Sequence, residues 1–140
     1  MKVLLPMPEL QNYLHAIYPQ TKSRFTVQRL EDGTLEMLMH MTENDVRPGG
    51  TISGPSIFML VDCAFYALTL SLIGKEALAV TTNININFVR KATQKELLCR
   101  TRMLKFGTQL CVGDALVYSD ELLIAQASIT YSIPPNRMKK

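Results

Sequence analysis

Cysteine and histidine are scarce in this chain of 140 residues. The three cysteines are odd in number and show no Cys-X-X-Cys spacing, which argues against a disulfide framework. Cys63, Cys99 and Cys111 each lie inside an apolar run, as reduced and buried thiols of cytosolic proteins do. We therefore expect three free thiols and a cytoplasmic location.

Neither sign of charge is in large excess, because the chain has 15 Lys and Arg residues and 12 Asp and Glu residues, a net charge of +3. Apart from Arg137, Lys139 and Lys140 at the end, the excess is scattered along the chain. Such a pattern does not predict nucleic-acid binding. Small anionic ligands suit it better.

The sequence has no hydrophobic run typical of a secretion signal or a membrane span. The first apolar run is only three residues long and stops at Pro6. Residues 56–73 fall slightly short of the usual ~20 residues, and an Asp near the bilayer centre costs about 2.5–3.5 kcal/mol. We expect no contact with a membrane and one domain over residues 1–140, because this length supports a single core.

Hydrophobic periodicity outlines the order of elements. Within an N-terminal helical segment, residues 1–20, apolar side chains repeat at i, i+3, i+4 and i+7, which predicts an amphipathic helix. Two alternating runs around Asp32-Gly33 then predict a hairpin. After a long apolar helix, alternation predicts four strands, over residues 79–89, 96–106, 109–119 and 122–133, the last three joined by short turns as an antiparallel meander.

A helix that is apolar nearly all round must be covered on most sides. One antiparallel sheet that curls around the central helix provides this cover, so the sequence predicts an α+β domain. Residues 134–140 are predicted to form a flexible tail.

The start of the central helix is the most informative segment. Gly49, Gly50 and Gly54 free the backbone for close approach to a ligand, and Pro55 suits the first turn, where no N–H partner is needed. The Gly54 amide is therefore a candidate oxyanion donor. Asp62 lies within the apolar helix, where a charge is costly without hydrogen bonds. It is either a functional residue or a carboxylate bonded to a neighbouring strand or a water.

The segment 53–62, SGPSIFMLVD, resembles the motif of the hotdog-fold acyl-CoA thioesterases, most closely the phenylacetic-acid-degradation subfamily. That motif reads His-Gly-Gly, four residues, Leu, one residue, Asp. The chain keeps the spacing, the first Gly, the Leu and the Asp, but has Ser53 for His and Pro55 for the second Gly. The resemblance covers residues 24–134 and implies a hotdog fold, an antiparallel sheet wrapped around one long central helix.

The resemblance also implies residue roles. Asp62 would act as general base or nucleophile on the thioester, and the Gly54 amide would polarise its carbonyl. Thr81 holds the place of a Ser or Thr that orients the water in some members. Arg47 stands six residues before Ser53, where the family often has an Asn that supports the carbonyl. These departures bear on substrate choice more than on reaction class.

Coenzyme A would enter as part of the substrate, so we expect no separate cofactor and no metal. Arg90 and Lys91 end the Asn-rich strand, where their charges could meet coenzyme A phosphates, although a solvated strand end explains them equally well. The residues expected to contact substrate are Arg47, Ser53, Pro55, Asn83, Arg90 and Lys91. Weaker candidates for the phosphates are Arg100, Arg102 and Lys105. The residues that fit either an acyl pocket or the core, with core expected for most, are those of the Met-rich hairpin and Phe58, Phe65 and Tyr66.

The spacing of the two central residues has a consequence for assembly. Gly54 and Asp62 are eight residues apart, about 12 Å along a helix at 1.5 Å per residue. Both groups must come within about 3 Å of the reacting atoms, so one subunit cannot supply both. We therefore predict a homodimer with two shared sites, as the resemblance also implies, and beyond it a dimer of dimers.

Three alternatives remain. A hydratase of the same fold pairs its acid with a His, but Ala67 stands where that pattern places it, and the two histidines, His15 and His40, lie outside the segment. A non-catalytic acyl-CoA-binding module is favoured by the two departures in the motif and disfavoured by retention of Asp62. A nucleophilic Cys63 lacks a nearby His in the sequence.

Overall fold

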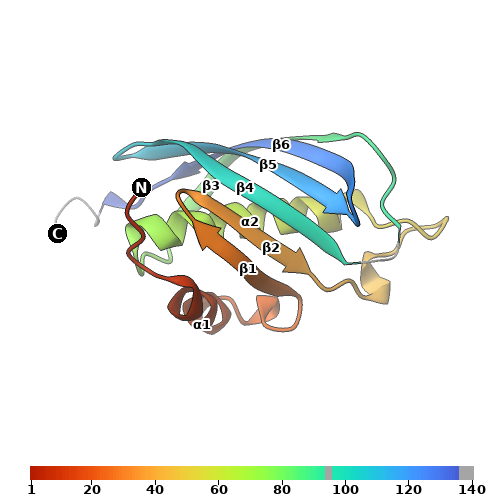
Figure 1. Ribbon diagram of the computed structural model, residues 1–140, viewed down its shortest axis with the longest axis horizontal. Helices are drawn as coiled ribbons and strands as arrows, with labels where there is room; N and C mark the ends of the chain where they lie inside the picture. The colour runs from red at the N-terminus through yellow and green to blue at the C-terminus, as the bar shows by residue number, and fades with distance from the viewer. Residues whose placement is uncertain (94–95, 136–140) are drawn as a thin grey trace.

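A six-stranded antiparallel sheet wraps around one long helix in the computed structural model, which describes residues 1–93 and 96–135 (Figure 1). The predicted α+β architecture, with one sheet around a central helix, is therefore confirmed. Most of the predicted tail, residues 136–140, lies outside the described residues. In chain order, the elements are α1 (Met7–Ile17), the 3-10 helix η1 (Pro19–Thr21), β1 (Phe25–Glu31), β2 (Thr34–Met39), the 3-10 helix η2 (Glu43–Asp45), α2 (Gly54–Ile73), β3 (Val80–Phe88), β4 (Leu97–Phe106), β5 (Leu110–Ser119) and β6 (Leu122–Ser132).

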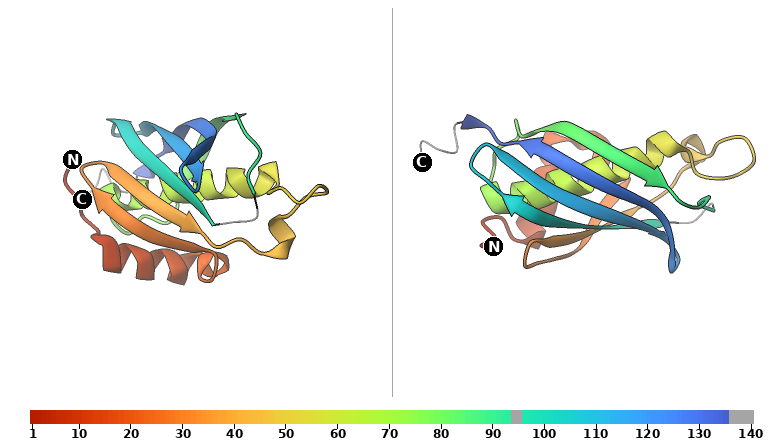
Figure 2. Two further views of the ribbon diagram at one scale, coloured as in Figure 1. Left: turned by 45° about the vertical axis from the view of Figure 1, so that its right-hand side comes forward. Right: turned by 90° about the horizontal axis from the view of Figure 1, so that it is seen from above.

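The strands lie in the order β1-β2-β4-β5-β6-β3, and every neighbouring pair is antiparallel. The predicted hairpin and meander are both present. The last strand, β6, lies between β5 and β3, so β3 forms an edge of the sheet, as the view from above shows (Figure 2). Within the described residues, the outer edge of β3 pairs with no strand.

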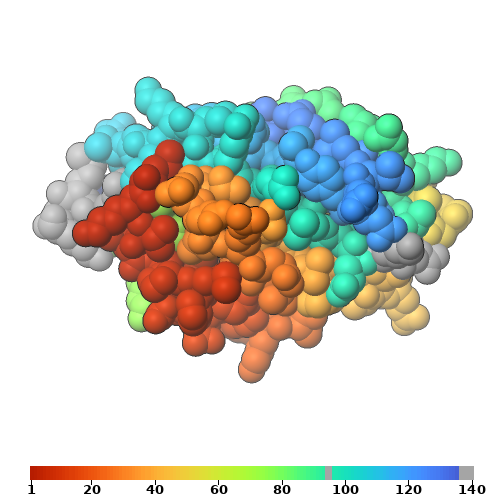
Figure 3. Space-filling model, viewed as in Figure 1, coloured from red at the N-terminus to blue at the C-terminus, as the bar shows by residue number. Residues whose placement is uncertain are grey.

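Helix α2 begins after Ser53 and ends at Gly74, whose φ of 89° is a conformation that glycine adopts without strain. Its length and composition would suffice for a membrane span, but 72% of its most apolar window is buried inside the domain. The N-terminal segment and the β1–β2 hairpin cover one side of the helix (Figure 3). Helix α2 is thus the core helix of the domain.

The concave face of the sheet and α2 together form the hydrophobic core. Met37 and Met39 of the hairpin are fully buried, as is Phe65 of α2, which agrees with the expectation of core. Phe58 departs from that expectation, because 43% of it is exposed. All three cysteines are free and buried, as predicted.

A β-bulge in β3 changes which side chains face the helix. Thr81 pairs with Tyr131 of β6, but Asn83 pairs with Thr130, so one extra residue stands between the two pairs. Strict alternation would place Thr81 on the same face as Asn83. The bulge instead turns Thr81 toward α2, together with Tyr131.

Candidate active site

The first turn of α2 is closed by serine hydroxyls. Ser53 is the N-cap, and its Oγ accepts a hydrogen bond from the Ser56 amide at 3.3 Å and donates to Ser56 Oγ at 2.9 Å. Pro55 follows in the first turn, where a missing N–H costs no hydrogen bond. No hydrogen bond links the Gly54 amide to any described residue. Since it lies at the positive end of the helix dipole, this amide is available to an oxygen of a ligand.

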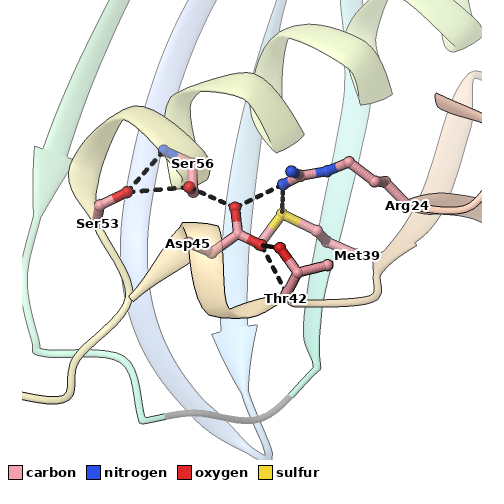
Figure 4. Close-up of polar contacts among 6 residues, drawn as sticks. All are labelled: Arg24, Met39, Thr42, Asp45, Ser53 and Ser56. Atoms are coloured by element: carbon pink, nitrogen blue, oxygen red, sulfur yellow. Dashed lines mark hydrogen bonds and ion pairs between the residues drawn. The ribbon is translucent and has the colours of Figure 1, made fainter. Parts of the chain in front are cut away.

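A buried carboxylate, Asp45, anchors this turn to the domain (Figure 4). Its Oδ1 accepts hydrogen bonds from the Ser56 hydroxyl at 2.6 Å and from Arg24 Nη2 at 2.7 Å, and its Oδ2 accepts one from the Thr42 amide at 2.8 Å. The Ser53 amide donates to the backbone oxygen of Asp45 at 2.7 Å. Burial alone would raise the pKa of Asp45, but the bonds from Ser56, Thr42 and Arg24 outweigh it and hold this pKa below its usual range. An ionised group thus fixes the start of α2.

Asp62 lies two turns further along α2 and receives two hydroxyl groups on one oxygen. Thr81 Oγ1 and the Tyr131 hydroxyl each donate to Asp62 Oδ1 at 2.6 Å. Among the described residues, none forms a hydrogen bond with Oδ2. The carboxylate is therefore bonded to neighbouring strands, as a structural residue would be, yet it keeps one oxygen for a ligand.

Two neighbours of Asp62 are held in their protonated forms. Burial, and then the charge of Asp62, raise the pKa of Tyr131 far above its usual range. The same two causes, in the same order, raise the pKa of the Cys63 thiol to about 12. A thiolate is the reactive form of cysteine, so the pKa of Cys63 counts against the alternative in which it is the nucleophile.

Asp62 opens into a pocket of about 600 Å³, called here the Asp62 pocket. Apart from Asp62 and Thr81, its walls are mainly apolar or aromatic, and α1 and the segment after it close one side. The lining residues are Ile17, Tyr18, Met59, Asp62, Cys63, Tyr66, Ala77, Leu78, Ala79, Val80, Thr81 and Tyr131. An apolar pocket with one carboxylate suits an uncharged group with one reactive polar bond.

A second pocket, the Gly54 pocket, measures about 470 Å³ and is lined by three cationic residues. Its residues are Arg47, Thr51, Ile52, Gly54, Ile57, Phe88, Val89, Arg90, Lys91 and Ala92. Arg90 also donates to the backbone oxygen of Leu123 at 2.9 Å, which fixes part of its side chain. In the Gly54 pocket, an anion would meet three cationic side chains and the backbone amide of Gly54 at the start of the helix.

The structure brings the predicted residues together in two groups. Asp62 and Thr81 share one pocket, and Gly54 shares the other with Arg47, Arg90 and Lys91. No described residue lines both pockets. Eight residues separate Gly54 from Asp62, about 12 Å on this continuous helix.

Other candidate residues lie elsewhere. Ser53 lines neither pocket, and its hydroxyl is used in the helix cap. The other candidate residues that line neither pocket are Pro55, Asn83, Phe58, Phe65, Arg100, Arg102 and Lys105. His15 and His40, which the sequence analysis placed outside the site segment, also line neither pocket. On the outer face of the sheet, Arg100 pairs with Glu36 and Arg102 with Asp114. The absence of both histidines from the pockets counts against the hydratase alternative.

Sequence reasoning missed three residues that build the site. Tyr131 lies 69 residues from Asp62 in the sequence and belongs to no recognisable motif. Asp45 and Arg24 form a buried ion pair at 2.7 Å, and only their strand and turn positions were visible in the sequence. The one signal in the sequence that could have been weighed is the position of Asp45, an acidic residue four positions before the Gly-rich turn.

A six-stranded antiparallel sheet wrapped around one long helix is the arrangement of the hotdog fold. The profile described as "Thioesterase superfamily" matches residues 49–125, which is more than half of the chain. The chain therefore belongs to the thioesterase superfamily.

Individual relatives agree with this assignment. The crystal structure of a candidate thioesterase from Silicibacter sp. TM1040 is 43% identical, covers 96% of both chains and superposes with a TM-score of 0.90. A candidate esterase from Thermoplasma acidophilum is 27% identical over 110 residues, 78% of this chain and 83% of the relative. A candidate thioesterase related to phenylacetic acid degradation, from Ralstonia eutropha JMP134, has a TM-score of 0.76 at 22% identity, covers 84% and 89% of the two chains, and shows a common fold alone.

Proposed function

We propose that the protein is an acyl-CoA thioesterase that hydrolyses a small or medium acyl thioester. The observation that carries the proposal is Asp62, which faces an apolar pocket, has Oδ1 held by two hydroxyls and has no hydrogen bond to Oδ2 from the described residues. Membership in the thioesterase superfamily supports the same reaction class.

Asp62 supplies the base or the nucleophile. As a base, Oδ2 removes a proton from water while the water oxygen bonds to the thioester carbon. As a nucleophile, Oδ2 bonds to that carbon itself, and water then releases the acyl group from the resulting anhydride. In both routes the C–S bond breaks, its electron pair leaves with sulfur, and the thiolate takes up a proton.

The Gly54 amide would stabilise the negative charge that develops on the carbonyl oxygen. Such a donor is effective because it is fixed before the reaction starts, and the Asp45 network fixes the turn that contains it. In the same pocket, Arg47, Arg90 and Lys91 offer positive charge to the phosphates of coenzyme A.

One chain holds Asp62 and Gly54 in different pockets, so the complete site requires a second copy. The outer edge of β3, which pairs with no strand in the described part of the chain, and nearby exposed apolar residues suit a two-fold contact between copies. Those residues are Phe58, Val80, Phe88 and Val89, each at least 43% exposed. In a dimer of this kind, the Gly54 pocket of one subunit would adjoin the Asp62 pocket of the other.

The test is a panel of acyl-CoA substrates assayed for release of free thiol. We expect wild-type turnover of at least one substrate and a loss of at least ~10²-fold in Asp62→Asn, the usual scale for a positioned base. The Cys63→Ala variant is the control and should keep most of the activity, since the raised pKa of the Cys63 thiol in the wild type disfavours the reactive thiolate. Near wild-type rates in Asp62→Asn would reject the assignment.

A non-catalytic acyl-CoA-binding protein is the second candidate. Ser53 stands where the family motif has His, so the chain has no imidazole at this position, and the Ser53 hydroxyl is used in the helix cap. Calorimetric binding of an acyl-CoA without thiol release from any member of the panel would favour this second candidate.

A further inference from the structure

Tyr131 is not part of the motif that led to Asp62, yet it touches the same oxygen as Thr81. Its hydroxyl lies 2.6 Å from Asp62 Oδ1 and 3.1 Å from the Asp62 backbone oxygen. A phenol has a single proton to donate, and the shorter contact to the charged acceptor takes it. Tyr131 therefore donates to the carboxylate.

The position of Tyr131 is fixed on every side. The residue is only 2% exposed, and its ring packs against Phe65 at 5.4 Å and Tyr66 at 6.1 Å between centroids. The β6 backbone on both sides is hydrogen-bonded, because Tyr131 pairs with Thr81 on β3 and with Cys111 on β5. A side chain with so little freedom holds its acceptor in one orientation.

The two hydroxyls reach Asp62 as a cross-strand pair. Thr81 and Tyr131 stand directly opposite one another, and the bulge after Thr81 lets both face α2. Thr81 is exposed, whereas Tyr131 is buried. The exposed hydroxyl can still accept a hydrogen bond from water, but the buried hydroxyl has Asp62 as its acceptor among the described residues.

We propose that Tyr131 is a positioning residue that fixes the Asp62 carboxylate through Oδ1 and thereby presents Oδ2 to the substrate. This inference rests on the proposed function, because it assigns Oδ2 as the reacting oxygen. Tyr131 itself contacts no reacting atom and transfers no proton, since its hydroxyl remains protonated throughout.

The test compares Tyr131→Phe, which keeps the ring and removes the hydroxyl, with Tyr118→Phe, which removes a hydroxyl from the outer face of the sheet. We expect Tyr131→Phe to lower kcat about 10- to 100-fold, the scale of one hydrogen bond to a charged group, with KM changed less than about threefold. Tyr118→Phe should match the wild type. An unchanged kcat in Tyr131→Phe would overturn the proposal.

A second readout does not depend on turnover. Crystal structures of the wild type and both variants report the orientation of the Asp62 carboxylate. The carboxylate should rotate in Tyr131→Phe, because Thr81 alone then holds Oδ1, and should keep its position in Tyr118→Phe. An unmoved carboxylate in Tyr131→Phe overturns the proposal.

The two proposals fail in different ways. If the wild type hydrolyses no thioester of the panel, the proposed function is rejected, whereas the orientation of the carboxylate still decides whether Tyr131 holds Asp62. If Tyr131→Phe does not fold, protein labelled with 3-fluorotyrosine answers the question. The fluorine signal of Tyr131 should differ between the wild type and Asp62→Asn, because the variant loses the charged acceptor, and an identical signal overturns the proposal.

Discussion

Two inactive variants, Asp62→Asn and Gly54→Val, are expected to restore each other's activity when their subunits exchange. The valine fits the fold, because a Cβ on Gly54 would meet the exposed ring of Phe88 at 3.4 Å, while its methyl groups crowd the amide. A heterodimer then has one site with both lesions and one with neither. It should reach about half the activity of a wild-type dimer.

The expected signal in the mixture is smaller, and the numbers follow from random pairing. Equal amounts of the two variants give about half heterodimers, so the whole sample should reach about one quarter of the wild-type activity per chain. Thiol release measures activity, and native mass spectrometry measures exchange. Activity that stays absent after confirmed exchange would falsify the shared site. Each variant, incubated alone in the same way, is the control.

Three further outcomes are expected. Asp45→Asn should lower the free energy of unfolding by about 3 kcal/mol, because Arg24 loses its charged partner. Folding lowers the pKa of Asp45, so the wild type has this extra stability above about pH 4 and loses it as the pH falls through the folded-state pKa. Chemical denaturation should therefore show that the stabilities of the two proteins converge in acid. Gly113→Ala should lower the melting temperature, with a cost of about 1–3 kcal/mol or more, because its methyl would lie 2.1 Å from Phe65 Cε1, and an unchanged melting temperature contradicts this packing. Lys91→Glu should raise KM about tenfold for coenzyme A thioesters but not for N-acetylcysteamine thioesters, which lack the phosphates, and equal effects on both would remove Lys91 from the phosphate site.

Short-range patterns made most of the fold predictable. The Asp32-Gly33 turn has both residues at positive φ, 45° and 72°, and the hairpin around it was evident from alternation. The central helix was evident from its apolar composition and its Gly-Pro start. Local geometry suffices for such elements because their hydrogen bonds join residues close in sequence.

The pairing of β3 with β6 was not predictable in the same way. It joins Thr81 to Tyr131, 50 positions along the chain, and no turn between them specifies the register. Alternation alone places Thr81 with Asn83, on the wrong face, and only the family resemblance pointed to it. The bulge that corrects this placement depends on packing across the sheet, which the spacing of residues does not encode.

The candidate site was predictable to the extent that a motif marked it. Asp62 and Gly54 came from the helix and its turn, and their separation on α2 is the basis of the predicted shared site, which stays a prediction. Asp45 and Tyr131 are single residues in ordinary strand and turn positions, and their roles come from contacts with distant segments. Such contacts exist only after the chain has folded.

Because β6 is the last strand of the sheet in the sequence, the sheet can be completed only once β6 has been synthesised. β3 leaves the ribosome well before β6, and β6 is its one partner strand in the described chain. Until the last strand emerges, β3 has two open edges, a state prone to association with other chains. Tyr131 arrives on that same strand. A chain that ends before residue 122 would therefore contain Asp62 and Gly54 but would lack both the pairing of β3 with β6 and the Tyr131 hydroxyl that orients the Asp62 carboxylate.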